Sequence, residues 1–216
     1  MPENVNPLVV VIAVLVAVGL LRVQTWRALL CLWPKSLRVE PEEPASALTV
    51  SGVLEPAVDA LRAQGFTVVG SHSEAPRLGP AELFVDLAHA GSGIWAQVSA
   101  PHSRDERSAR VTLLTPTDGA WVLTSNFRRP ARDTARVAVG GLEGATPERL
   151  VKAHARRLAA GASLPEVSLD ARVALARDWY ASVGVTEVRL QHARGLMWSL
   201  FALGLLAAPF VTAARS

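Results

Sequence analysis

The chain has 216 residues, of which 50% are hydrophobic, and its formal net charge is +3. This length allows one domain of ordinary size with additional segments. The mean hydropathy of +0.26 is high for a soluble protein and low for a polytopic transporter. The single cysteine, Cys31, excludes a fold held together by an intramolecular disulfide.

A long apolar segment follows a short tail of residues 1–7. Residues 8–21 carry no charge, and a helix over them spans about 21 Å, which is shorter than a hydrocarbon core about 30 Å thick. We therefore expect the helix to continue, with Arg22 and Arg27 extending to the lipid headgroups. The tail contains no Lys or Arg, unlike a cleaved signal peptide. The pattern predicts a transmembrane helix with an interfacial extension over residues 8–33.

A linker and a soluble domain are expected next. Residues 34–48 are polar and contain prolines, which is typical of a linker. Residues 49–185 read as a soluble α+β domain. It opens with a helix in which Leu54, Val58 and Leu61 recur at helical spacing.

The middle of the domain is rich in segments typical of β-strands. Thr117-Asp118-Gly119 is a strong hairpin signal between two of them. Strands that follow one another through short turns form an antiparallel meander. We therefore predict an antiparallel β-meander of about five strands. The segments are 66–69, 82–89, 94–99, 109–115 and 120–126, and a last short strand is compatible with 136–139.

The end of the chain is predicted to be helical. Thr146 is a good N-cap for a first helix, and a second helix begins near Ser168. A third helix, over residues 186–214, continues into an apolar run at 196–213, which spans about 27 Å. The predicted fold class is therefore α+β: an antiparallel meander covered by helices and flanked by an N-terminal and a C-terminal transmembrane helix.

The charges beside the two apolar segments predict their orientation. Basic residues lie mainly on the domain side, and Arg215 alone lies on the far side. The positive-inside rule then places the domain in the cytoplasm and both termini outside. Small residues four apart could let the two membrane helices approach closely, either within one molecule or between copies. These residues are Ala13, Ala17, Gly204 and Ala208.

The sequence contains no recognisable metal-binding, nucleotide-binding or hydrolase motif. The five histidines are widely spaced and no second cysteine exists, so we expect no metal and no cofactor. No P-loop, dinucleotide fingerprint or Gly-x-Ser-x-Gly elbow is present. Serines lie near His72, His89 and His102 in the sequence. Asp86 and His89 should face opposite sides of one strand. No catalytic residue is predicted.

A cluster of arginines is the one feature above background. In a meander, the connection before strand 109–115 and the end of strand 120–126 lie at the same edge of the sheet. Such an edge attracts anionic headgroups or an acidic protein. The arginines that we expect there are Arg104, Arg107, Arg110, Arg128, Arg129, Arg132 and Arg136.

The sequence therefore favours a membrane-anchored binding or scaffold protein. Its domain would dock a protein or an anionic membrane surface through the arginine-rich edge. One alternative is a subunit of a larger membrane complex, in which the spans contact another membrane protein or a second copy. Another is a hydrolase with a dispersed site, which would need a deep pocket lined by histidines, serines or acids. Nucleic acid is disfavoured, because no reader motif and few exposed aromatics are present.

Overall fold

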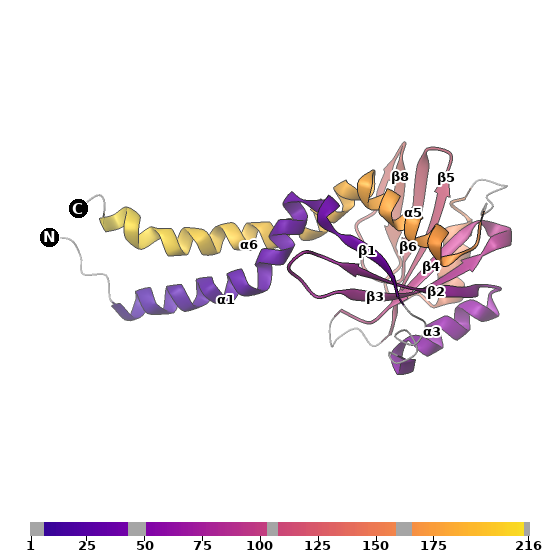
Figure 1. The fold of residues 1–216 in the computed structure, drawn as a ribbon, viewed down its shortest axis with the longest axis horizontal. Coiled ribbons are helices and arrows are strands. Elements are labelled where there is room, and N and C mark those ends of the chain that lie inside the picture. Colours follow the sequence, from indigo (N-terminus) through magenta and orange to yellow (C-terminus); the bar gives the residue numbers. More distant parts are fainter. Residues whose placement is uncertain (1–6, 43–50, 103–107, 159–165, 214–216) are drawn as a thin grey trace. The chain divides into compact units, whose positions relative to one another are not determined.

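The computed structural model describes residues 7–42, 51–102, 108–158 and 166–213, and within the last segment it describes side chains up to Ala208 (Figure 1). The chain divides into two compact units. The first comprises Met1–Arg38, Ala75–Pro80 and Tyr180–Ser216. The second comprises Val39–Glu74 and Ala81–Trp179.

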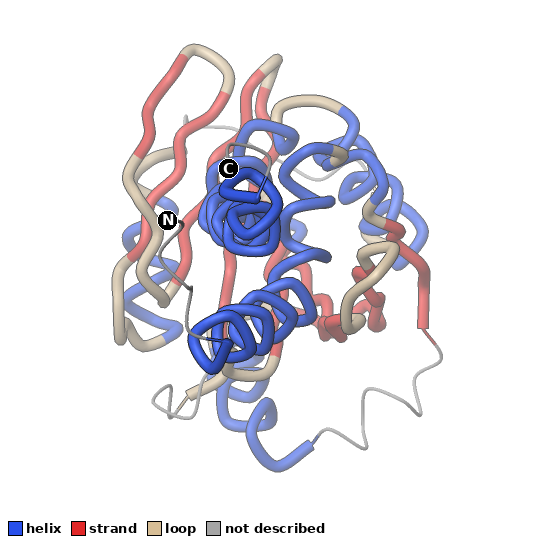
Figure 2. The backbone as a smooth tube through the Cα atoms, turned by 90° about the vertical axis from the view of Figure 1, so that its left-hand side faces the viewer, coloured by secondary structure: helices blue, strands red, loops and turns tan. Residues whose placement is uncertain are grey.

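The first unit is built on an antiparallel helical hairpin. Helix α1 (Pro7–Leu32) is followed by a short 3-10 helix, η1 (Pro34–Ser36), and α6 (Gly184–Ala213) returns beside α1 in the opposite direction (Figure 1). Figure 2 shows the two helices nearly end-on. Contacts near the other end are specific: the Cys31 thiol donates to the Arg189 carbonyl at 3.7 Å, and the Trp26 and His192 rings meet edge-on with centroids 5.5 Å apart.

Among the described residues, one helix is long and apolar enough to cross a membrane. It runs from Leu8 to Leu32, with a mean hydropathy of 2.4 and 6% of its most apolar stretch buried. Membrane spans and signal sequences share this length and composition. The second span, predicted at 196–213, is helical within α6 but gains no support from this criterion, which covers only the described residues.

The second unit contains a mixed sheet of eight strands among the described residues, in the order β1-β2-β3-β4-β5-β6-β8-β7. From β2 to β6, each strand pairs antiparallel with the next, β8 pairs parallel with β6, and β7 pairs antiparallel with β8. The strands are β1 (Arg38–Glu42), β2 (Thr67–Ala75), β3 (Glu82–His89), β4 (Ile94–Ser99), β5 (Arg110–Thr117), β6 (Ala120–Ser125), β7 (Arg132–Thr134) and β8 (Val137–Gly141).

The prediction of a simple five-stranded meander is therefore wrong, although the α+β class and the mostly antiparallel sheet are confirmed. The chain does not simply turn back after β6. Instead it forms the β7–β8 hairpin, and β8 inserts beside β6 in parallel. Strand β1 lies within the segment 34–48, which was expected to be a linker. β1 is the edge strand at one end of the sheet. Its backbone can pair without an alternation of apolar and polar residues, so the sequence carries no clear strand signal there.

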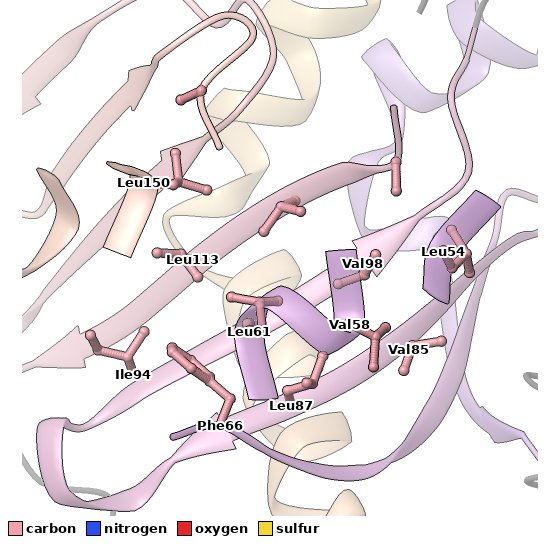
Figure 3. Close-up of a cluster of buried hydrophobic side chains, with 14 residues drawn as sticks. Leu54, Val58, Leu61, Phe66, Val85, Leu87, Ile94, Val98, Leu113 and Leu150 are labelled. Carbon is pink, nitrogen blue, oxygen red and sulfur yellow. The ribbon is translucent and has the colours of Figure 1, made fainter. Parts of the chain in front are cut away.

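One face of the sheet carries the apolar core, and we call it the α3 face. Helix α3 (Ser51–Ala63) places Leu54, Val58 and Leu61 over alternate residues of β3, β4 and β5 (Figure 3). Helix α4 (Pro147–Ala155) adds the fully buried Leu150. Burial of each such leucine stabilises the fold by about 1.5–3 kcal/mol. The strand residues in contact are Val85, Leu87, Ile94, Ala96, Val98, Val111 and Leu113.

Helix α4 begins where the sequence predicts. The Thr146 hydroxyl accepts a hydrogen bond from the Arg149 amide at 3.4 Å, and Pro147 occupies the first helical position. This cap fixes where α4 starts relative to β8, and so where its last turn meets the sheet.

That last turn places a histidine inside the core. The Thr115 hydroxyl donates to the Gly93 carbonyl at 3.0 Å, so it accepts from His154 Nε2 at 3.1 Å. His154 Nδ1 then accepts from the Thr124 hydroxyl at 2.9 Å. Burial lowers the pKa of His154 and the neighbouring Arg157 lowers it further, to about 3. The ring is therefore neutral and fully hydrogen-bonded.

This network predicts a pH dependence of stability. Because the folded pKa of His154 is lowered, its contribution is complete above about pH 6.5 and declines as the pH falls toward 3, since the unfolded chain then binds a proton that the folded chain does not. The loss should reach about 3 kcal/mol near pH 4. In His154→Leu this component is absent. Chemical unfolding of the full-length chain in mild detergent, followed from pH 7 to pH 4, measures the difference. Parallel pH curves for the two proteins would contradict the assignment.

Candidate functional site

The opposite face of the sheet is covered by helix α5 (Leu169–Ala181), and we call it the α5 face. The helix packs closely at its start, because a Cβ on Gly70 would lie 2.9 Å from the Leu169 side chain. Near its end, the Trp179 and Trp121 rings meet with centroids 5.2 Å apart. The Arg177 guanidinium donates to the Val39 carbonyl at 2.8 and 3.1 Å. Helix α5 therefore contacts the sheet at several strands, from β1 at Val39 to β6 at Trp121.

A buried charge cluster lies beneath α5. Adjacent strands β2, β3 and β4 bring His72, Asp86 and Gln97 to the α5 face, where Arg172 meets them. Arg172 Nε lies 3.0 Å from one Asp86 oxygen, and Arg172 also donates to Gln97 Oε1. His72 Nδ1 contacts the other Asp86 oxygen, and its Nε2 lies 3.3 Å from Glu74 Oε1.

Burial and hydrogen bonding act in opposite directions on His72. Burial alone lowers the pKa of His72, but the hydrogen bonds to Asp86 and Glu74 outweigh it and the pKa is raised. His72 and Asp86 are completely inaccessible to solvent. Both imidazole nitrogens are occupied, so His72 is not an accessible base. The cluster joins α5 to the sheet through Arg172.

The histidines considered for a hydrolase all have structural partners. Ser71 and Ser73 alternate with His72 along β2 and so lie on the other face, where Ser71 donates to the Glu42 carbonyl at 3.4 Å. His89 accepts from the Ser92 amide at 3.2 Å and caps the 3-10 turn η2 (Ala90–Ser92). Among the described residues, no group of three His, Cys, Asp or Glu side chains is placed to hold a metal.

Asn126 joins the start of β5 to the end of β6, and this junction positions part of the predicted arginine cluster. Its backbone amide donates to the Val111 carbonyl at 3.0 Å, its side-chain oxygen accepts from the Val111 amide at 2.7 Å, and its side-chain nitrogen donates to the Ala109 carbonyl at 2.9 Å. Phe127 follows. The guanidinium carbon of Arg110 lies 3.6 Å from its ring centroid, and that of Arg129 lies 5.5 Å away.

The backbone that carries these residues packs tightly on β8. A Cβ on Gly141 would lie 2.3 Å from the Phe127 carbonyl oxygen and 2.6 Å from the Arg129 amide nitrogen. Glycine at this position is therefore what allows the segment to lie against the strand. Arg129 is held further by a bond from its Nη1 to the Ser125 hydroxyl at 3.4 Å.

The structure brings two of the predicted arginines, Arg110 and Arg129, together at the Phe127 ring and separates Arg136 from them. Arg128 is exposed, and Arg132 is half-buried on β7. Arg136 is exposed but precedes Val137, which pairs with Trp121 at the opposite end of β6 from Ser125. Arg104 and Arg107 lie outside the described residues. We use "arginine edge" for Arg110, Arg128, Arg129 and Arg132.

Acidic and imidazole groups border the arginine edge. His102 Nε2 lies 2.7 Å from Glu82 Oε1, and the other ring nitrogen contacts Arg110. Burial alone would raise the pKa of Glu82, but hydrogen bonding to His102 and Ser99 and the charge of Arg110 lower it below its usual value. Glu82 therefore balances part of the positive charge on Arg110. The most exposed cation of the edge is Arg128.

The helical hairpin packs through a narrow seam of mostly small residues. Ala17 and Ala202 are completely buried. Gly195 is needed for the closest approach, since a Cβ there would lie 2.3 Å from the Arg27 Cβ. Of the other residues predicted to pack, Ala13 is half-buried and Ala208 is exposed, and no atom lies within 4 Å of a Cβ built on Gly204.

The rest of the hairpin surface is apolar and exposed. Large hydrophobic side chains on both helices face outward, away from the seam. On α1 they are Leu8, Val9, Val11, Ile12, Val14, Leu15, Val16, Val18, Val23 and Leu32. On α6 they are Leu190, Met197, Trp198, Leu200, Phe201 and Leu203.

Two glycines of α6 allow a matched test of the seam. Gly195→Ala should weaken the hairpin by about 1–3 kcal/mol, because the new methyl group meets the α1 backbone region. Gly204→Ala faces open space and should be neutral or stabilise α6 by up to about 1 kcal/mol. Unfolding of the full-length chain in mixed SDS micelles, followed by circular dichroism, reports both. Equal effects of the two substitutions would mean that Gly195 does not lie in the seam.

Comparisons with known proteins add no relative to this picture: no family model, curated protein or solved structure matches the chain significantly.

Proposed function

We propose that this chain is a membrane-anchored binding or scaffold protein. The α1–α6 hairpin spans the bilayer twice, and the domain docks an acidic partner protein through the arginine edge. The observation that carries the proposal is the exposed apolar surface on both paired helices.

The number of large apolar side chains exposed on the two helices supports the anchor. Soluble monomers rarely expose contiguous apolar patches larger than a few hundred Å². Helix α1 has 26 residues and α6 has 30, so each is about 40 Å long or more and exceeds the hydrocarbon thickness of about 30 Å. Lipid chains stabilise such faces where water does not. The backbone is satisfied within each helix, as a membrane span requires.

The orientation rests on the charges that flank the two helices. The positive-inside rule places the flanking cations in the cytoplasm. The domain is then cytoplasmic, and the termini lie outside. The cations on the domain side are Arg22, Arg27, Lys35, Arg38, Arg189 and Arg194, and Arg215 is the one cation on the far side.

The way in which the guanidinium groups are held supports a protein partner. Arg110 and Arg129 are fixed against the Phe127 ring, and Arg129 is also bonded to Ser125. A fixed guanidinium fork matches the geometry of a carboxylate, whereas an anionic membrane surface needs only diffuse positive charge. Beside them, Arg128 is exposed and available for contact.

An enzymatic role receives less support from the site. The one His–Asp pair found beneath α5 is fully buried, and both nitrogens of its imidazole are engaged. A substrate would have to displace α5 to reach it.

Single charge reversals test the docking surface. Arg128→Glu, at the arginine edge, should weaken binding of a fluorescent polyglutamate peptide by about fivefold or more. Arg136→Glu changes the net charge equally at the other end of β8, and it should weaken binding by less than about twofold. The measurement is fluorescence anisotropy with the full chain in nanodiscs of neutral lipid.

The control variant decides between local recognition and general attraction. Equal losses in Arg128→Glu and Arg136→Glu would reduce the effect to net charge and contradict the docking site. No peptide binding, together with Arg128-dependent binding to anionic vesicles, would overturn the protein partner in favour of a membrane surface.

A further inference from the structure

A groove of about 420 Å³ lies beside α1 within the first unit. Five of its lining residues come from two turns of α1 and one comes from the loop between β2 and β3. They are Val18, Leu21, Arg22, Thr25, Trp26 and Leu78.

The outer wall of the groove is built by close packing of that loop on an indole ring. A Cβ on Gly79 would lie 2.7 Å from the Pro76 ring and 3.0 Å from the Trp26 ring, so glycine lets the loop lie against Trp26. Trp26 is also contacted by the His192 ring, and the Arg27 guanidinium carbon lies 5.1 Å from its centroid. The adjacent Leu78 remains 66% exposed. The wall is thus positioned by specific contacts, yet it presents an apolar side chain outward.

The lining of the groove contains one charged residue, Arg22. Arg22 is exposed, and within the described residues no hydrogen bond or ion pair occupies its guanidinium. The Thr25 hydroxyl donates to the Leu21 carbonyl of its own helix at 2.5 Å, which leaves Arg22 as the charged donor of the lining. No acidic residue lines the groove. One guanidinium above an apolar wall matches a phosphate diester that carries acyl chains.

The position of the groove along α1 fits the same ligand. From Val18 to Trp26 the helix rises about 12 Å. The headgroup layer on each side of a bilayer is about 5–7 Å thick. In the proposed anchor, a lining of this length would extend from the hydrocarbon, at Val18 and Leu21, into the headgroup layer, at Arg22 and Trp26.

We infer that this groove binds one anionic phospholipid, with its phosphate on Arg22 and its upper acyl chain against Val18, Leu21 and Leu78. An anionic headgroup is preferred because Arg22 is the one charged residue of the lining, and its positive charge attracts the net charge of an anionic lipid. The inference rests on the proposed membrane anchor and adds a specific lipid to it.

Native mass spectrometry of the full chain tests the site. The protein is released from bilayers that contain phosphatidylglycerol and phosphatidylcholine in equal amounts, and the retained lipids are identified. The wild-type chain should retain phosphatidylglycerol in preference to phosphatidylcholine. Arg22→Gln should abolish the preference, whereas Arg189→Gln, an exposed arginine outside the groove, should keep it. Leu78→Ser should reduce the lipid retained, and Leu190→Ser, at a comparable exposure of 61%, should not.

The possible results separate this inference from the anchor itself. A chain that inserts into the bilayer but retains no lipid, or that loses its preference equally in Arg22→Gln and Arg189→Gln, overturns the lipid site and leaves the anchor intact. A chain that stays in the aqueous phase overturns both.

Discussion

Two apolar helices pair in this fold through a very narrow seam. Ala17, Ala202 and Gly195 bring α1 and α6 together closely, but small residues bury little surface. Most of the large aliphatic and aromatic side chains then remain outside the contact. In water this arrangement would be unfavourable at about 25 cal/mol for each Å² of apolar surface left exposed. In lipid, close packing through small residues is a normal way for helices to associate. The narrow seam and the exposed apolar side chains are therefore consistent with the membrane hairpin that we propose.

The second unit differs from the hairpin, because helices cover its sheet on both faces and bury the side chains there. The α3 face buries aliphatic side chains and a neutral histidine, His154, whose partners are hydroxyl groups. The α5 face instead buries Arg172 with Asp86, and a histidine, His72, whose pKa is raised by its carboxylate partners. The same residue type thus takes opposite protonation behaviour on two faces of one sheet, because its neighbours differ. Charge pairing, rather than apolar packing alone, determines where α5 lies.

Much of the secondary structure could be predicted from local pattern. Strand-like composition identified β3 and β4, capping chemistry identified the start of α4, and apolar continuity identified the helix at the C-terminal side. The strand predicted at 66–69 is shorter than β2, because Ser71 to Glu74 are polar and carry no local strand signal. Their burial depends on Asp86 and Arg172, which are distant in sequence. The parallel placement of β8 also depends on a pairing that no local pattern encodes.

In the candidate site, too, local sequence predicts some features, and others depend on contacts between residues that are distant in sequence. The sequence could bring Arg110 near residues after β6, but the role of Phe127 as their common platform requires the bonds made by Asn126. Arg136 was expected in the cluster because it is close in sequence, whereas the β7–β8 hairpin carries it to the other end of β8. In the hairpin, spacing suggested Gly204, while the actual close approach is at Gly195. A four-residue spacing does not specify which face of a helix meets its neighbour.

If lipid surrounds the hairpin, thiols introduced on its exposed apolar surface will be shielded from water, and cysteine labelling measures this. In a Cys31→Ala chain reconstituted into vesicles, Leu15→Cys and Leu200→Cys would each place one thiol on the exposed apolar surface, and Asp118→Cys would place one on an exposed turn of the domain. The first two thiols should react with a lipid-soluble maleimide and resist a water-soluble one, whereas the third should react with the water-soluble reagent from the side that it faces. Rapid labelling of Leu15→Cys and Leu200→Cys by the water-soluble reagent would mean that water, and not lipid, surrounds the hairpin.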